Sequence, residues 1–408
     1  MAATFAESDL RIVRDLARQL MDLAQSDDYE RRRQRWRDVN ELRTPDRAPV
    51  WCRPALVWRE IMPDSVLQCE DPTCRNIERS LRRDLYKDTV GDDHIVEPWW
   101  GVRATIRAEE PPVWGLQTKQ SIGSTEQGGF KYFHPIETPD DYEKLRVPSF
   151  YYDTEATERA ASQIQDVLGD AMPVRVTGYP PLVPQLQNYL EALRGMGPMM
   201  EDLAFRPEMV HRAMAKLTEG VLNAMRVTEE AGVLTTNHHE PMFCSDPVND
   251  PPEDGPVGLH NLWVAANSQE FDTVSPPMHE EFLLSYQKVL FQSFGRAQYG
   301  CCESLSNKTD IVLGIPNLRI FVCSFWSDLE EIIEACGTDY CIMWRQSAAQ
   351  VTLPDTLDEY REHLERGLQM LQGHHYQIVL RELETLHGHE NRLQDWADVS
   401  IQLAEKWA

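Results

Sequence analysis

The sequence has no excess of basic residues. It contains 40 Lys and Arg against 66 Asp and Glu, which gives a formal net charge of −26 and a pI near 4.8. Proteins that bind nucleic acid or anionic lipid depend on clustered Lys and Arg, because these side chains neutralise phosphate groups. The charge balance therefore argues against nucleic acid and against a membrane surface as partners.

Long apolar runs and dense cysteines are also missing. No run of about 18 apolar residues occurs, so no transmembrane helix is expected. The first twenty residues, MAATFAESDLRIVRDLARQL, lack the basic and apolar regions of a secretory signal. Nine cysteines in 408 residues are an odd number and too few for a disulfide scaffold. We therefore expect a cytoplasmic protein with reduced thiols, in which neighbouring cysteines are candidates for metal binding or catalysis.

The N-terminal part of the chain differs in pattern from the rest. Apolar residues recur at three- and four-residue steps from Leu10 to Leu23, which predicts a helix over residues 8–38. Residues 45–135 are rich in Trp and Pro and show no regular pattern. We therefore interpret residues 1–95 as a helical and irregular N-terminal extension.

From about residue 150, short apolar strands alternate with helices, which is typical of a parallel sheet. Strands are expected at 173–177, 232–236, 297–301, 318–323, 340–344 and 376–381, with two weaker ones at 50–58 and 98–106. Eight such units predict an α/β fold, a (β/α)8 TIM barrel, over residues 96–408. A dinucleotide-binding sheet is the weaker alternative, because no GxGxxG motif follows the first strand.

In such a barrel the chemistry lies where the strands end. Polar, aromatic and metal-binding side chains follow five of the expected strands. They are Tyr179, then His238, His239 and Glu240, then Cys301, Cys302 and Glu303, then Trp326, and finally Trp344 and Arg345. The sequence thus predicts an active site at this end of the barrel.

Three short runs carry the possible chemistry, and each also has a structural interpretation. Cys301 and Cys302 could bind zinc as thiolates, or one could pack in the core and the other lie in a loop. The run from His238 to Glu240 could supply metal ligands, acids, bases or substrate contacts, or could be a polar loop. Gln269 and Glu270 could supply an amide donor and a carboxylate ligand, or a helix cap.

Several runs resemble one known group of proteins. They are Phe133-His134-Pro135-Ile136, Asn267-Ser268-Gln269-Glu270, Val274-Ser275-Pro276-Pro277-Met278-His279-Glu280-Glu281-Phe282, Tyr299-Gly300-Cys301-Cys302-Glu303 and Ile315-Pro316-Asn317-Leu318-Arg319. Together they are similar to the uroporphyrinogen decarboxylase-like superfamily, in particular to the branch with a YGCCE motif that accompanies corrinoid-dependent methyltransferases and O-demethylases. The resemblance covers about residues 130–345 and implies a (β/α)8 barrel.

The same resemblance implies zinc chemistry, but the ligand motifs of this chain differ from those of the zinc methyltransferases. The zinc methyltransferases of that superfamily use a His-x-Cys and a later Cys, whereas this chain has Tyr299-Gly300-Cys301 and no later motif. Glu270, His239 or Glu240 would therefore have to replace the missing ligands. The arginine-rich motif of the true decarboxylases is absent, which argues against decarboxylation of haem precursors.

Our first hypothesis is a methyltransferase that moves a methyl group between a small O-methyl compound, such as a methoxylated aromatic, and a corrinoid protein. The proposed zinc ligands are Cys301, Cys302, Glu270 and His239, and the proposed catalytic acids are Glu240 and His238. The proposed substrate contacts are Tyr179, Asn267, Gln269, Glu303, Trp326, Trp344 and Arg345. The cobalamin would be carried by the partner protein, and a homodimer is one option for the assembly.

Two alternatives remain open at the level of sequence. One is a metal-independent decarboxylase or lyase, in which Arg345 holds a substrate carboxylate and His238 protonates the product. The other is a non-catalytic binding protein on the same barrel, because a fold does not imply an activity.

Overall fold

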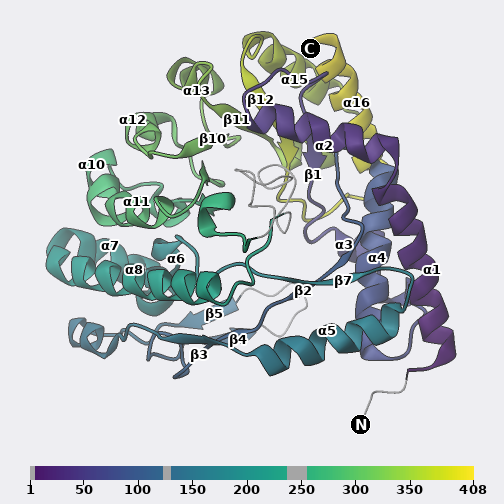
Figure 1. Cartoon of the computed structure of the whole chain (residues 1–408). Coiled ribbons are helices and arrows are strands. Elements are labelled where there is room, and N and C mark those ends of the chain that lie inside the picture. The colour runs from purple at the N-terminus through teal and green to yellow at the C-terminus, as the bar shows by residue number, and fades with distance from the viewer. Residues whose placement is uncertain (1–4, 123–129, 237–254) are drawn as a thin grey trace.

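The computed structural model describes residues 5–122, 130–236 and 255–408. Its centre is a parallel sheet of six strands in the order β1-β12-β11-β10-β9-β8. The strands are β1 (Val50–Cys52), β8 (Trp263–Ala266), β9 (Arg296–Tyr299), β10 (Leu318–Cys323), β11 (Cys341–Gln346) and β12 (His375–Leu380). The sheet is curled like half a barrel (Figure 1).

Three further strand pairs lie outside this sheet. Strands β2 (Trp100–Arg103) and β7 (Val174–Thr177) pair in parallel. Strands β3 (Ile106–Ala108) and β6 (Phe150–Tyr152), and β4 (Lys119–Ile122) and β5 (Phe130–Phe133), pair antiparallel. The structure therefore confirms a mixed α/β fold with a parallel sheet, whereas closure into an eight-stranded barrel stays a prediction.

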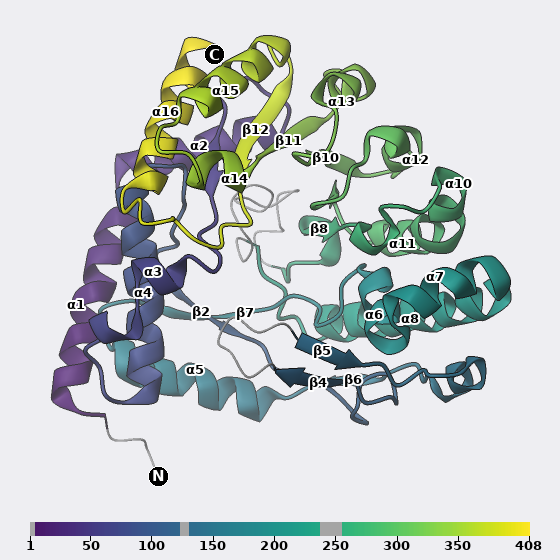
Figure 2. The ribbon, with the colours of Figure 1, turned by 180° about the vertical axis from the view of Figure 1, so that it is seen from behind.

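Most of the helices flank the strands on the outside, as both views of the ribbon show (Figures 1 and 2). The N-terminal helices are α1 (Glu7–Ala24), α2 (Asp27–Asn40), α3 (Trp58–Ile61) and α4 (Pro72–Val90). The central ones are α5 (Thr154–Leu168), α6 (Leu186–Arg194), α7 (Met196–Phe205), α8 (Pro207–Glu230), α10 (Pro276–His279) and α11 (Ser285–Phe291), with a π-helical turn at Glu280–Leu284. The C-terminal ones are α12 (Thr309–Leu313), α13 (Leu329–Cys336), α14 (Ala348–Thr352), α15 (Asp358–Met370) and α16 (Arg392–Lys406).

Three of our predicted elements were wrong in detail. The helix expected over residues 8–38 is two helices, because the Ser26 hydroxyl accepts a hydrogen bond from the Tyr29 N–H and starts α2. The strand expected at 232–236 is an irregular segment, joined to the β7 end through contacts of Thr235 with Gly178. Strand β8 lies in a region where we expected no strand.

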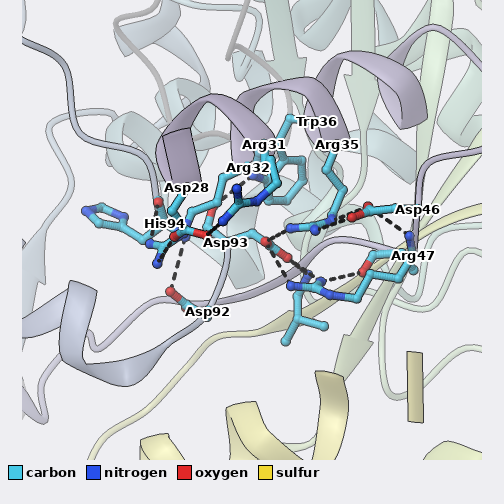
Figure 3. A network of polar contacts seen from close by, with 12 residues as sticks. Asp28, Arg31, Arg32, Arg35, Trp36, Asp46, Arg47, Asp92, Asp93 and His94 are labelled. Carbon is cyan, nitrogen blue, oxygen red and sulfur yellow. Dashed lines mark hydrogen bonds and ion pairs between the residues drawn. The ribbon is translucent and has the colours of Figure 1, made fainter. Parts of the chain in front are cut away.

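The N-terminal extension is attached to the sheet through β1 and a buried ionic network. The carboxylate of Asp93 accepts hydrogen bonds from Arg35, from Arg47 at 2.7 Å and from the Val50 N–H at 2.8 Å. Figure 3 shows Asp93 between the two guanidinium groups. The neighbouring Asp92 accepts from the Cys52 N–H at 2.8 Å. Residues 1–95 therefore supply one strand of the sheet as well as the helices beside it.

Of the helices in the described ranges, none is both long and apolar enough to cross a lipid bilayer.

Candidate functional site

The two adjacent cysteines lie where β9 ends. Gly300, whose φ is 111°, turns the chain there, and a Cβ at this position would lie 2.8 Å from the Cβ of Val322. The turn leaves Cys301 and Cys302 half-buried, with their sulphur atoms 3.6 Å apart. Two side chains that would point to opposite faces of a strand are thereby brought to one place.

A guanidinium and a carboxylate complete this group. Nη1 of Arg345, on β11, lies 3.6 Å from Sγ of Cys301, 3.9 Å from Sγ of Cys302 and 3.2 Å from Oε1 of Glu382. Oε1 of Glu382, two residues beyond β12, lies 3.6 Å from Sγ of Cys302. Arg345 is only 2% exposed. We call these four residues the thiol cluster.

The thiol cluster separates the acidities of its two cysteines. The hydrogen bond from Cys302 and the charge of Arg345 lower the pKa of Cys301 to about 6, against the effect of burial. The pKa of Cys302 is raised, because its proton is held in that hydrogen bond and because it is partly buried. The cluster therefore favours a thiolate on one of the two sulphurs, stabilised by the guanidinium of Arg345 and by the remaining thiol.

Contacts between two loops fix the position of the thiols. Oε1 of Glu303 accepts hydrogen bonds from the N–H and hydroxyl of Ser268, at 2.6 and 3.1 Å, and Oε2 accepts from the Cys301 N–H at 2.9 Å. The buried ammonium of Lys308 donates to the carbonyls of Phe271 and Asp272, at 2.6 and 2.9 Å. Residues 267–272 and 300–308 are therefore held together as one unit.

The other sequence-predicted residues of the β8 loop have separate surroundings. Oδ1 of Asn267 accepts from Gln187 at 2.8 Å, whereas Gln269 is exposed. Glu270 accepts a hydrogen bond from Asn188, and its Oε2 is buried without a partner among the described residues. Burial raises the pKa of the Glu270 carboxyl.

A buried chain of hydrogen bonds runs behind the β8 loop. Nε2 of His279 lies 2.9 Å from the Tyr299 hydroxyl, which donates to Gln287 at 3.0 Å. Gln287 donates in turn to the Asn267 carbonyl at 3.3 Å. Burial lowers the pKa of His279 to about 3, so its imidazole is neutral. Sequence analysis did not identify His279 or Gln287 as part of the site.

The three predicted aromatic contacts have different environments. The Tyr179 hydroxyl donates to the Trp263 carbonyl at 3.0 Å. Trp326 is 70% exposed and lies against Phe325, with ring centroids 4.6 Å apart. Trp344 is buried and contacts α15, where a Cβ at Gly367 would lie 2.0 Å from its ring.

A pocket of about 840 Å³ opens at this end of the sheet. The loops that follow β10 and β11 line it, together with part of α15, and Arg345 and Glu382 from the thiol cluster contribute to its wall. Phe325 and Trp326 supply an aromatic side. The pocket is large enough for a small organic ligand.

Some predicted residues cannot be placed. Glu240, His238 and His239 lie in 237–254, outside the described residues, and their roles stay predictions. Within the described part of the chain, no three His, Cys, Asp or Glu side chains are gathered as a metal site.

Sequence analysis also missed Glu382. The rule that favoured residues at strand ends would have found it, because it follows β12 closely, but the run RELETLH around it suggests an ordinary polar surface. Its partner Arg345 was identified, although as a contact for substrate.

Comparison with known proteins gives a match at the level of structure. No protein family model matches the sequence, and no curated protein matches it. Among solved structures, the fold is similar to that of a methyltransferase from Methanosarcina mazei, with a TM-score of 0.53. The sequences are 14% identical, and the alignment covers 91% of this chain and 98% of that chain. At this identity the similarity shows the fold alone.

Proposed function

We propose that the protein is a methyltransferase that transfers a methyl group from a small O-methyl compound to a corrinoid protein. The thiol cluster beside the pocket carries the proposal, because its two adjacent thiols follow the end of a parallel strand, and enzymes with parallel α/β sheets perform their chemistry at that end. The similarity of fold to a methyltransferase supports the same class of reaction.

The two thiols suit a zinc ion. Two thiolates on a tetrahedral zinc, with Zn–S bonds of about 2.3 Å, have sulphur atoms about 3.8 Å apart. The sulphurs of Cys301 and Cys302 are 3.6 Å apart. We therefore propose that these two residues hold zinc, which would supply a Lewis acid for the substrate oxygen. Glu270 and His239 stay the further ligands proposed from sequence.

The remaining residues would bind the substrate and donate a proton to its leaving oxygen. During the reaction the C–O bond breaks, the methyl group passes to the nucleophile of the corrinoid protein, and the oxygen takes a proton. That acid is the role proposed for Glu240 and His238. The exposed ring of Trp326 gives an aromatic substrate a surface to stack on.

The test measures methyl transfer and zinc together. Purified protein is assayed for zinc and for methylation of reduced free cobalamin by a panel of methoxylated aromatic compounds. We expect bound zinc and transfer in the wild type, and loss of both in the Cys301→Ala, Cys302→Ala double variant. Cys336→Ala, which changes a buried cysteine on α13, is the matched control. A double variant that keeps its zinc would refute the assignment.

The metal-independent decarboxylase is less well supported. That mechanism requires Arg345 to hold a substrate carboxylate, but Arg345 is already paired with Glu382 at 3.2 Å. A substrate would have to displace an intramolecular carboxylate from a buried guanidinium.

A further inference from the structure

The thiol cluster brings two thiols close enough to react with each other. The sulphurs of Cys301 and Cys302 are 3.6 Å apart, and rotation of the side chains with a distortion of the backbone between them would bring the sulphurs to the disulfide bond length of about 2.0 Å. Both side chains are half-buried, whereas the other described cysteines are buried. A small oxidant in solution therefore reaches this pair in preference to the other described thiols.

A disulfide between neighbouring residues is strained and so is easily reduced. Consecutive Cα atoms are about 3.8 Å apart across a trans peptide bond, whereas disulfides usually join Cα atoms about 4.4–6.8 Å apart. Strained and accessible disulfides are the labile ones, because their reduction relieves the strain. A bond between Cys301 and Cys302 would therefore open again when a dithiol is present.

The charged neighbours give the two cysteines different roles. Nη1 of Arg345 lies 3.6 Å from Sγ of Cys301 and 3.9 Å from Sγ of Cys302, and a cation at this place stabilises a thiolate, the reactive form of cysteine. Sγ of Cys302 in turn donates to Oε1 of Glu382 at 3.6 Å. The geometry thus gives Cys301 the nearer cation and Cys302 an acceptor for its proton.

Glu382 has two features that ordinary surface carboxylates lack. Its φ is 57°, in the left-handed region that a residue with a Cβ rarely adopts, and such a conformation persists where the surroundings hold it. Its Oε2 is buried without a hydrogen-bond partner in the described part of the chain. The carboxylate is therefore held beside Cys302 with one oxygen free to accept a proton.

We propose that Cys301 and Cys302 form a disulfide with each other when a peroxide oxidises them, and that Glu382 accepts the proton of Cys302. The Cys301 thiolate attacks a peroxide oxygen, the O–O bond breaks, hydroxide leaves and a sulfenic acid forms. Sγ of Cys302 then attacks Sγ of Cys301 and the S–O bond breaks, while Glu382 passes the proton to the leaving hydroxide. One thiolate, one thiol and one hydrogen peroxide thus give a disulfide, one water and one hydroxide.

This modification goes beyond the proposed function and does not depend on it. The disulfide removes both thiols from the end of β9 and leaves Arg345 paired with Glu382 alone. Chemistry that needs a thiol beside the pocket therefore stops on oxidation and returns on reduction.

The test follows the tryptic peptide of residues 297–308, which contains Cys301 and Cys302 and no other cysteine. The reduced, chelator-treated full-length protein receives an equimolar amount of hydrogen peroxide, and samples are blocked with iodoacetamide at intervals. We expect mass spectrometry to find a peptide that has lost two hydrogens and takes up no iodoacetamide. Dithiothreitol should return both of its thiols to the alkylatable form.

Three variants separate the steps, and circular dichroism confirms that each is folded. Cys302→Ser should stop at the sulfenic acid of Cys301, which dimedone traps. Glu382→Gln should slow disulfide formation about tenfold or more, because it removes the base, and should give more dimedone adduct than the wild type. Glu384→Gln removes an exposed carboxylate two residues away and should behave as the wild type.

The proposal is overturned if the wild-type peptide stays reduced, proceeds to a sulfinic acid or is linked to another cysteine. Disulfide formation in Glu382→Gln at the wild-type rate overturns the role of Glu382. A disulfide that forms in a protein without methyl transfer supports the inference while the proposed function fails.

Discussion

At the scale of single residues, the thiol of Cys301 differs from the other described cysteines. Cys52, Cys69, Cys74, Cys323, Cys336 and Cys341 are buried, and burial raises the pKa of each. Cys301 alone among them has a cationic neighbour and a thiol donor that together outweigh burial. Among the described cysteines it is therefore the one whose surroundings lower the thiol pKa.

Alkylation of the metal-free protein tests this assignment. Because a thiolate is the nucleophile, the rate of Cys301 alkylation by iodoacetamide should rise with pH and reach half its maximum near pH 6. Arg345→Gln removes a charge that lowers this pKa, and Cys302→Ala removes the S–H donor, so both should shift the midpoint to higher pH. Peptide mass spectrometry measures the rate at Cys301, with Cys301→Ala as the blank. A wild-type midpoint near pH 9 would contradict the prediction.

At the scale of elements, strand β11 is buried along its whole length and packs closely on α15. All six of its residues are buried, as expected for a central strand of a parallel sheet covered on both faces. The ring of Trp344 occupies the space beside Gly367 of α15, where any larger residue would meet it. The helix can approach the strand because Gly367 has no side chain.

Gly367→Ala should therefore destabilise the protein. The added Cβ would lie 2.0 Å from the Trp344 ring, and such overpacking costs about 1–3 kcal/mol. Gly197→Ala in α7 is the control, because nothing lies within 4 Å of its added Cβ and alanine favours a helix by about 1 kcal/mol. Urea denaturation measures both. If the two variants were equally stable, α15 would be able to move away from β11 with no loss of unfolding free energy, and the prediction would be wrong.

The elements also show what sequence can and cannot predict. Periodicity located β10 to the residue, because its apolar run is continuous and is flanked by clear breaks. Strand β8 was missed because WVAA is four residues long and is surrounded by polar turns. The segment 232–236 has the composition of a strand, but its only buried residue is Leu234, and pairing depends on neighbours that sequence does not reveal. For the same reason Glu382 became visible only when the fold placed it beside Cys302.

At the scale of the whole molecule, the N-terminal extension and the sheet form one structure. Strand β1 pairs with β12, and Asp93 joins Arg35 of α2 to Arg47 and to β1. A chain that begins at residue 96 would lack one strand of the sheet and the helices packed beside it. The boundary at residue 95, which we predicted from composition, therefore marks a change in sequence pattern. It does not mark the edge of a part that folds on its own.

Asp93→Asn measures how strongly this network supports the fold. Asp93 is 1% exposed, and loss of its charge leaves Arg35 and Arg47 buried without their shared carboxylate. Breaking such a pair costs about 3–5 kcal/mol. Glu155→Gln removes an exposed ion pair with Arg159 and should cost less than about 1 kcal/mol. Urea denaturation compares the two, and a loss at Asp93 no greater than at Glu155 would contradict the prediction.

The pairing of β1 with β12 also has a consequence for biosynthesis. Val50 pairs with Ile378, so the first strand leaves the ribosome long before its partner is translated. Until then the nascent chain exposes the apolar edge of β1 and the N-terminal helices that depend on the sheet. The sheet can therefore be completed only after β12 has been translated, and a chaperone that shields the N-terminal segment until then should raise the yield of native protein.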